Sequence, residues 1–489
     1  MENDPKTDPW FSGAVQLAAD IRHKRFSATE LLDIFLARIE RYNPALNAIV
    51  VFDTDAARAA ARTADAALAA GNATGPLHGV PMTVKESFDL AGYPSTFGRP
   101  DRRDHRAARD ALAVERLKTA GAVIVGKTNV PIDLADWQSF NEIYGDTVNP
   151  WDAARSPGGS SGGATAALAA GLTGLEIGSD IGGSIRVPAH FCGVYGHKPT
   201  YGIVPLRGHA FEPGDAEPDI MVAGPLARRA EDLAATLDVI AGADPEAPGA
   251  WRLDLPDEPR TKLSGFRIAV ITDDAVYPVD NDTRKSLSDV ADYLAAEGAT
   301  VLRDPALPLP SEEMWQLYLS VLRGATSGRL SDAEAAAAAE RAAGFDPSDK
   351  SYGPVMLRSL SQRHQAWLHA NDRRSKLRAL WREFFGNADA LIVPMMATPA
   401  FPHIRGIAKQ DQRLHVDNAE RPISDTYFWI GLASASHLPA TLAPAGTSRD
   451  GLPIGMQIIG PEAQDRCCIA LAQMLERGFR GFTPPPGYD

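Results

Sequence analysis

Two glycine-rich stretches, Ser156-Pro-Gly-Gly-Ser-Ser-Gly-Gly163 and Gly178-Ser-Asp-Ile-Gly-Gly-Ser-Ile-Arg186, decide the fold and the chemistry of this chain of 489 residues. Each predicts a loop that presents a serine. A third stretch, Gly79-Val-Pro-Met-Thr-Val-Lys85, supplies a lysine. Together they offer a nucleophile, a proton relay and a base without any histidine, and such a set suits acyl transfer at an amide or ester carbonyl.

The second stretch can supply the hydrogen-bond donors that carbonyl chemistry requires. Attack on a carbonyl develops an oxyanion, and backbone N–H groups of a glycine loop can be aimed at it. The expected donors are Ile181, Gly182, Gly183 and Ser184. The expected supports of the two loops are Ser161, Asp180 and Arg186.

Lys85 is the candidate base. It follows the apolar residues 81–84, which predict a buried strand. A buried lysine loses hydration, so its pKa falls and the neutral amine becomes available as a base. Taken singly, the motifs also fit a flexible linker, a helix cap or a solvent-facing lysine, but the three together favour a catalytic site.

The motifs resemble those of the amidase signature family, whose hallmark is a Ser-cisSer-Lys triad. The resemblance implies that Ser184 is the nucleophile, that Lys85 is the base, and that Ser160 is the relay serine after a cis peptide bond. It also implies an acyl pocket near Leu134 and Trp137, although Trp137 fits an ordinary core tryptophan equally well.

The resemblance covers residues 27–475, with further matches such as Gly126-Lys-Thr-Asn129 and Gly451-Leu-Pro-Ile-Gly-Met-Gln457. It implies one domain over 1–489, with a core of about 27–245 and 386–475 and a variable, mostly helical insertion of about 246–385. Departures from the family are Glu86, Ser179 and His197, where many members have Asp, Thr and Leu. None of them removes a catalytic atom.

Alternating strand and helix patterns predict an α/β fold, with a central mixed sheet covered by helices on both faces. Ser27-Ala-Thr-Glu30 predicts a helix start, and Pro44 predicts its end. Residues 162–170 predict a helix of small residues. Strands are expected near 172–177, 267–271, 299–302, 390–393, 439–443 and 453–459. Residues 311–385 look mainly helical.

Two motif matches fail on their context. Gly121-Ala-Val-Ile-Val-Gly-Lys-Thr128 fits a phosphate-binding P-loop, but its central residues predict a strand where a turn is needed. Gly158-Gly-Ser-Ser-Gly162 fits the nucleophile elbow of α/β-hydrolases, but Arg155-Ser-Pro157 cannot end the strand that must precede it.

Composition limits the partners. The net charge of −13 disfavours nucleic acid and anionic membranes, which need a basic face. Three unpatterned cysteines, no apolar leader and no long apolar run predict a cytoplasmic protein that needs no membrane. The motifs hold no cluster with metal-ligand spacing, so no metal and no cofactor is expected.

The expected function is hydrolysis of a small to medium hydrophobic amide, anilide or carbamate through an acyl-enzyme, with ester side activity, by a monomer or homodimer. One alternative is the glutamine-hydrolysing subunit of a tRNA-dependent amidotransferase complex, which would need partner proteins. Another is a non-catalytic binding protein on the same fold. Turnover of a panel of amides, anilides, carbamates and esters separates them.

Overall fold

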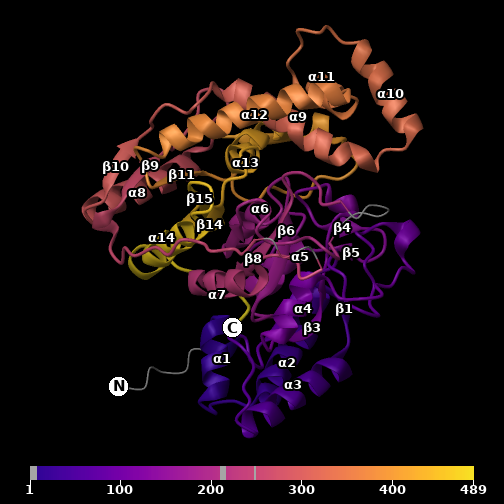
Figure 1. Cartoon of the computed structure of the whole chain (residues 1–489), viewed down its shortest axis with the longest axis vertical. Coiled ribbons are helices and arrows are strands. Elements are labelled where there is room, and N and C mark those ends of the chain that lie inside the picture. Colours follow the sequence, from indigo (N-terminus) through magenta and orange to yellow (C-terminus); the bar gives the residue numbers. More distant parts are fainter. Residues whose placement is uncertain (1–7, 210–215, 247–248, 250) are drawn as a thin grey trace.

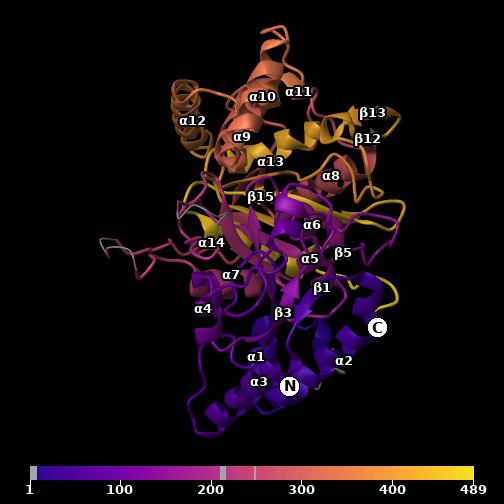
Figure 2. The ribbon, with the colours of Figure 1, turned by 90° about the vertical axis from the view of Figure 1, so that its right-hand side faces the viewer.

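The computed structural model describes residues 8–209, 216–246, 249 and 251–489. The polar start of the chain, residues 1–7, where no leader is expected, lies outside the described residues. Two sheets cross the middle of the molecule. The N-terminal helices lie at one end and the helices of residues 311–384 at the other, and both views agree on this (Figure 1, Figure 2).

The larger sheet is mixed. Its first three strands in space are parallel, and the remaining neighbours are antiparallel. Among the described residues the strands are, in spatial order, β10 (Thr300–Arg303), β9 (Arg267–Val270), β11 (Ala390–Pro394), β15 (Pro453–Ile459), β14 (Ala440–Thr447), β7 (Tyr195–Lys198), β8 (Val222–Ala227) and β6 (Glu176–Asp180).

A smaller sheet carries Lys85. It orders β1 (Ile49–Phe52), β3 (Val123–Thr128) and β2 (Pro81–Lys85), and β2 is parallel to β3. The other edge of β2 joins the segment before β6, because Thr83 N–H donates to the Leu175 carbonyl (3.3 Å) and Gly174 N–H to the Pro81 carbonyl (3.0 Å). The junction connects the lysine strand to the strand that leads to Ser184. Two short hairpins complete the described strands: β4 (Phe140–Asn141) with β5 (Gly145–Asp146), and β12 (Arg413–Val416) with β13 (Ala419–Pro422).

Helices surround both sheets (Figure 1). Their bounds are α1 (Ala14–Arg22), α2 (Ala28–Leu46), α3 (Thr54–Ala69), α4 (Leu112–Thr119), α5 (Gly162–Ala169), α6 (Arg186–Cys192), α7 (Ala230–Ile240), α8 (Asn281–Ala296), α9 (Ser311–Thr326), α10 (Asp332–Ala343), α11 (Tyr352–Leu360), α12 (His364–Phe384), α13 (Tyr427–Ser434) and α14 (Asp465–Gly478).

The side chains of each strand point alternately to the two faces of the larger sheet, and this divides the apolar core into two clusters. In β11, Ala390 and Ile392 pack into a cluster with α7, α8 and α14, whereas Leu391 and Val393 pack into one with α6, α9, α12 and α13. Successive strand side chains point to opposite faces, so each face of the large sheet buries its own apolar layer. The expected single α/β domain, with a mixed sheet covered on both faces, is confirmed.

Helix α5 forms where the sequence predicts a helix of small residues. Every residue of Gly162–Ala169 is buried. A Cβ on Gly163 would lie 2.4 Å from the backbone nitrogen of Asn129, so only glycine allows the helix to pack this closely. The close packing fixes the start of α5 and, with it, the serine loop that precedes the helix.

Two boundaries differ from expectation. Ser27 and Glu30 form the predicted capping box of α2, but the helix passes Pro44 and ends at Asn47, which adopts a left-handed conformation. Proline removes one N–H bond of the helix, and α2 continues for only two residues beyond Pro44. Within 246–385, residues 267–303 supply strands β9 and β10 to the larger sheet, with helix α8 between them in the chain. The purely helical part is therefore residues 311–384. The larger sheet thus extends into a segment expected as insertion.

No helix in the described part of the chain is both long and apolar enough to cross a membrane. Cys192, Cys467 and Cys468 are buried and free. Burial raises the pKa of the Cys192 and Cys467 thiols to about 12, so both stay protonated and unreactive at neutral pH.

Candidate active site

Lys85 is the last residue of β2, and its side chain is fully buried. Its Nζ donates to Oγ of Ser160 (2.7 Å) and to Oγ of Ser179 (3.0 Å). Burial lowers the pKa of Lys85 to about 7, although the charges of Asp180 and Glu176 act in the opposite direction. Near neutral pH, a large fraction of this amine is therefore neutral and able to accept a proton.

The first serine loop depends on two glycines. Gly158 has a φ of +87°, a conformation that side chains disfavour. A Cβ on Gly159 would lie 2.4 Å from the carbonyl oxygen of Asp136. The Gly159–Ser160 peptide bond is cis, as the family resemblance implies. The two glycines let the chain turn here, and Ser160 Oγ lies beside Lys85.

The second serine loop follows β6 and is held by one carboxylate. Asp180 accepts hydrogen bonds from the N–H groups of Gly183 (2.9 Å) and Ile185 (3.2 Å) and from two guanidinium nitrogens of Arg186 (2.9 Å each). Burial opposes ionisation of this carboxyl, but the Arg186 guanidinium outweighs it and holds the pKa of Asp180 at about 2. Asp180 thus stays ionised and braces the loop.

The two loops are also tied to each other and to α13. Ser161 N–H donates to the Ser184 carbonyl (3.2 Å), and Arg186 donates to Oγ of Ser434 (2.7 Å) and to Gln457. Ser161, Asp180 and Arg186 therefore lie where supports of the loops were expected.

A small cavity joins these loops. Its wall is formed by Leu134, Ser160, Ser179, Ile181, Ser184, Met221 and Arg329. The centre of a water-sized molecule has only about 10 Å³ of room. Among the described residues the Ser184 hydroxyl makes no hydrogen bond, so it is available to a ligand in the cavity. This volume is too small even for a small amide, so the cavity must widen when a substrate binds.

Not every expected residue occupies its expected place. Leu134 lines the cavity, as expected. Trp137 does not: it is buried behind the nucleophile loop, and its indole N–H donates to the Gly182 carbonyl (2.8 Å). Of the four expected oxyanion donors, Gly183 already gives its N–H to Asp180, which leaves Ile181, Gly182 and Ser184.

Three cavity residues were not among the expected site residues. Ser179 differs from the threonine of many family members, but it retains the hydroxyl that Lys85 contacts. Because serine keeps the hydroxyl of threonine, the sequence could have indicated Ser179 as a contact of Lys85. Met221 and Arg329 carry no motif; Arg329 reaches the cavity from the helical part of the chain, where it donates to the Asp133 carbonyl (2.8 Å).

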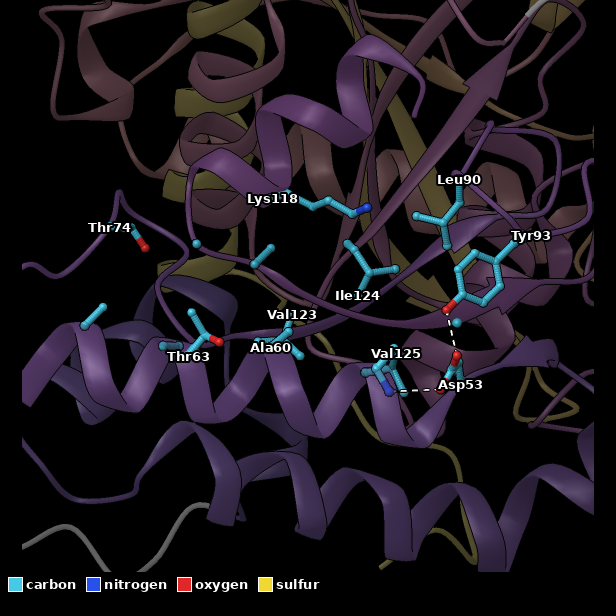
Figure 3. Close-up of a pocket in the computed structure, with 16 residues that line it drawn as sticks. Asp53, Ala60, Thr63, Thr74, Leu90, Tyr93, Lys118, Val123, Ile124 and Val125 are labelled. Carbon is cyan, nitrogen blue, oxygen red and sulfur yellow. Dashed lines mark hydrogen bonds between the residues drawn. The ribbon is translucent and has the colours of Figure 1, made fainter. Parts of the chain in front are cut away.

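A larger cavity, of about 430 Å³, lies away from these serines, between α3 and β3 (Figure 3). Alanines of α3, including Ala60, and residues 123–125 of β3 form most of its walls. Its polar groups are already used: Tyr93 donates to Asp53 (2.9 Å), and Lys118 pairs with Asp110 (2.6 Å). With no nucleophile–base pair in its lining, this cavity is not the candidate active site.

The P-loop match is a buried strand rather than a phosphate-binding loop. Residues 123–128 form β3, and Lys127 is fully buried, where it donates to Oγ of Ser95 (3.0 Å) and to the Pro94 carbonyl. Across the described ranges, no group of three or more His, Cys, Asp or Glu side chains is arranged to hold a metal ion.

Comparisons with known proteins identify relatives over nearly the whole chain. The family model described as Amidase matches residues 30–469. An indoleacetamide hydrolase of Bradyrhizobium diazoefficiens is 32% identical over 96% of this chain and 87% of that protein. A glutamyl-tRNA(Gln) amidotransferase subunit of Anaeromyxobacter is 32% identical over 97% of each.

Among solved structures, a bacterial aryl acylamidase of the amidase signature enzymes has a TM-score of 0.81. It is 25% identical, and the match covers 98% of this chain and 99% of that one. The match extends over the two serine loops, both sheets and the helical part. The chain therefore belongs to the amidase signature family and is an enzyme that hydrolyses amides.

Proposed function

We propose that this enzyme cleaves the amide C–N bond with Ser184 as nucleophile, Ser160 as proton relay and Lys85 as base. The observation that carries the proposal is the 2.7 Å contact between Lys85 Nζ and Oγ of Ser160, a serine that lines the same cavity as Ser184.

The steps follow from these positions. Neutral Lys85 takes the proton of Ser160, which takes that of Ser184 as the Ser184 oxygen bonds to the carbonyl carbon. The N–H groups of Ile181, Gly182 and Ser184 hold the oxyanion. Collapse breaks the C–N bond, and the proton returns through Ser160 to the leaving nitrogen. Water, activated by the same relay, then hydrolyses the acyl-enzyme.

The preferred substrate is a small to medium hydrophobic amide, anilide or carbamate, with ester side activity. Leu134, Ile181 and Met221 supply the apolar side chains of the cavity wall, beside three serines and Arg329. The names of two similar proteins, an indoleacetamide hydrolase and an aryl acylamidase, point to aromatic amides. The enzyme acts on such small molecules as a cytoplasmic monomer or homodimer that uses no metal or cofactor and binds no nucleic acid or membrane.

A second candidate is supported by the amidotransferase component that is 32% identical to this chain. In that case the substrate is glutamine, and partner proteins accept the ammonia. A non-catalytic binding role has less support still, because the contact between Lys85 and Ser160 is intact.

A fluorophosphonate tests the mechanism, and a substrate panel tests the choice of substrate. The probe should label Ser184, and peptide mapping that finds the label on Ser160 or Ser161 would overturn the assignment. Hydrophobic anilides and carbamates should be hydrolysed faster than glutamine. Preferential release of ammonia from glutamine, together with co-purifying partner proteins, would favour the second candidate.

A further inference from the structure

Helix α9, in the helical part of the chain, contacts the nucleophile loop through one side chain. The Tyr318 hydroxyl donates to the Ile181 carbonyl (2.9 Å), and the residue is fully buried. Its ring lies against α13, where a Cβ on Gly431 would come within 2.8 Å of the ring carbons. Helices α9 and α13 lie side by side in both views (Figure 1, Figure 2). The glycine thus makes room for the ring, and the packing fixes the position of the hydroxyl.

The next two carbonyls of the loop are held as well. Trp137 Nε1–H donates to the Gly182 carbonyl (2.8 Å), and Val187 N–H donates to the Gly183 carbonyl (2.7 Å). In the described chain only the Gly159–Ser160 bond is cis, so these peptides are trans. In a trans peptide the carbonyl and the following N–H point in opposite directions. Each held carbonyl therefore sets the direction of the next N–H.

The N–H groups of Gly182 and Gly183 are oriented in this way toward different partners. The N–H set by Trp137 is that of Gly183, and it goes to Asp180. The N–H set by Tyr318 is that of Gly182, which forms no hydrogen bond among the described residues. Gly182 N–H is thus a donor left for the oxyanion, and the group that orients it belongs to the helical insertion.

We propose that Tyr318 is a positioning residue for the oxyanion hole, because its hydroxyl anchors the Ile181 carbonyl and so aims the Gly182 N–H at the developing charge. Trp137 does the same for the following peptide and keeps Gly183 on Asp180. The inference rests on the proposed function. Tyr318 does not line the catalytic cavity, so it acts through the loop and not on substrate.

The test variant is Tyr318→Phe, which removes only the hydroxyl. Loss of an oxyanion-hole donor lowers kcat by about 10²–10³-fold, and a misaimed donor should lower kcat about 10–100-fold. KM should change less than about twofold, because the ground-state carbonyl depends little on the oxyanion donors. The matched control is Tyr277→Phe, a buried tyrosine of the same core cluster, against Phe428 at 4.8 Å, which should keep wild-type kinetics.

Inhibitors separate positioning from general damage. A trifluoromethyl ketone forms a tetrahedral oxyanion adduct with the serine, so its Ki should rise in Tyr318→Phe by the same factor as kcat/KM falls. A thioether of the same shape, which has no carbonyl for the serine to attack, should bind to Tyr318→Phe with the same Ki as to the wild type. An equal loss for both inhibitors, or a kcat/KM within twofold of wild type, would overturn the inference.

Trp137→Phe repeats the test at the neighbouring peptide and serves if Tyr318→Phe does not fold. It should show the same split between kcat and KM, and the double variant should lose less than the product of the single losses, since both act on one loop. Fully multiplicative losses would contradict the shared role. Wild-type enzyme without amide turnover or Ser184 labelling would overturn the proposed function and this inference together, whereas active wild type with unaffected variants overturns the inference alone.

Discussion

The ends of β2 and β3 each bury a lysine, and the two lysines do different things. Lys85 and Lys127 are both fully buried, and burial lowers their pKa values to about 7 and about 8. The strands are parallel, with Val84 beside Lys127 and Lys85 beside Thr128. Because side chains alternate along a strand, the two lysines project from opposite faces of the small sheet.

The partners distinguish them. Lys85 contacts two serine hydroxyls, and one of them, that of Ser160, is the proposed relay to Ser184. Lys127 donates to the Pro94 carbonyl, which has no proton to give, and to Ser95. Desolvation alone therefore does not make a lysine a base. A base also needs a proton donor in contact with it that connects to the nucleophile.

Replacement of each lysine by methionine is the strongest way to break the comparison. Lys85→Met should lower kcat/KM by about 10³-fold or more, on the scale of triad deletions. Lys127→Met should leave kcat/KM within about threefold. Lys85→Arg should be as inactive as Lys85→Met, because a guanidinium stays protonated. If Lys127→Met lost activity as severely, β3 would have to contribute to the chemistry.

The pH dependence of acylation sharpens the comparison further. Deprotonation of Lys85 creates the base, so kcat/KM should rise about tenfold per pH unit below pH 7 and level off above it. Stopped-flow release of the leaving group from an activated ester measures this limb, and Lys85→Met should abolish it. A limb centred near pH 8 that disappears in Lys127→Met would assign the base to Lys127 instead.

Ser179 provides a smaller effect on the same contact. Ser179→Ala removes one of the two hydroxyls at Lys85 Nζ and should lower kcat/KM about tenfold, the scale of one hydrogen bond. Ser179→Thr keeps the hydroxyl and should stay within about threefold of wild type. Equal activity of the alanine and threonine variants would show that Ser160 alone orients the amine.

The smallest expected effect concerns stability. Lys127→Met leaves the buried Pro94 carbonyl without its donor, which should lower the free energy of unfolding by about 1–3 kcal/mol. Urea denaturation measures the loss. Lys118→Met, at a partly exposed ion pair, is the control and should change stability by less than about 1 kcal/mol. Unchanged stability of Lys127→Met would mean that Lys127 has no structural role either.

Local patterns in the sequence predicted much of the fold. The capping box at Ser27, the small-residue helix after Ser161 and the strand that ends in Lys85 all form as expected. The end of α2 was misplaced because the cost of Pro44 depends on its position in the helix. The strands β9 and β10 form where strands were expected, but they were assigned to an insertion and not to the larger sheet, because the pairing of β9 with the distant β11 leaves no local mark in the sequence.

The sequence by itself determined the family of this protein and the local parts of its proposed catalytic site: two glycine-rich serine loops and a lysine after an apolar strand, each set by the conformations of a few neighbouring residues. Only the tertiary structure decided that Trp137 lies behind the second serine loop, that Arg329 lines the cavity, and that Tyr318 contacts the Ile181 carbonyl. The physical reason is distance along the chain. Those contacts depend on sheet register and on the packing of α9 against α13, which no short pattern encodes.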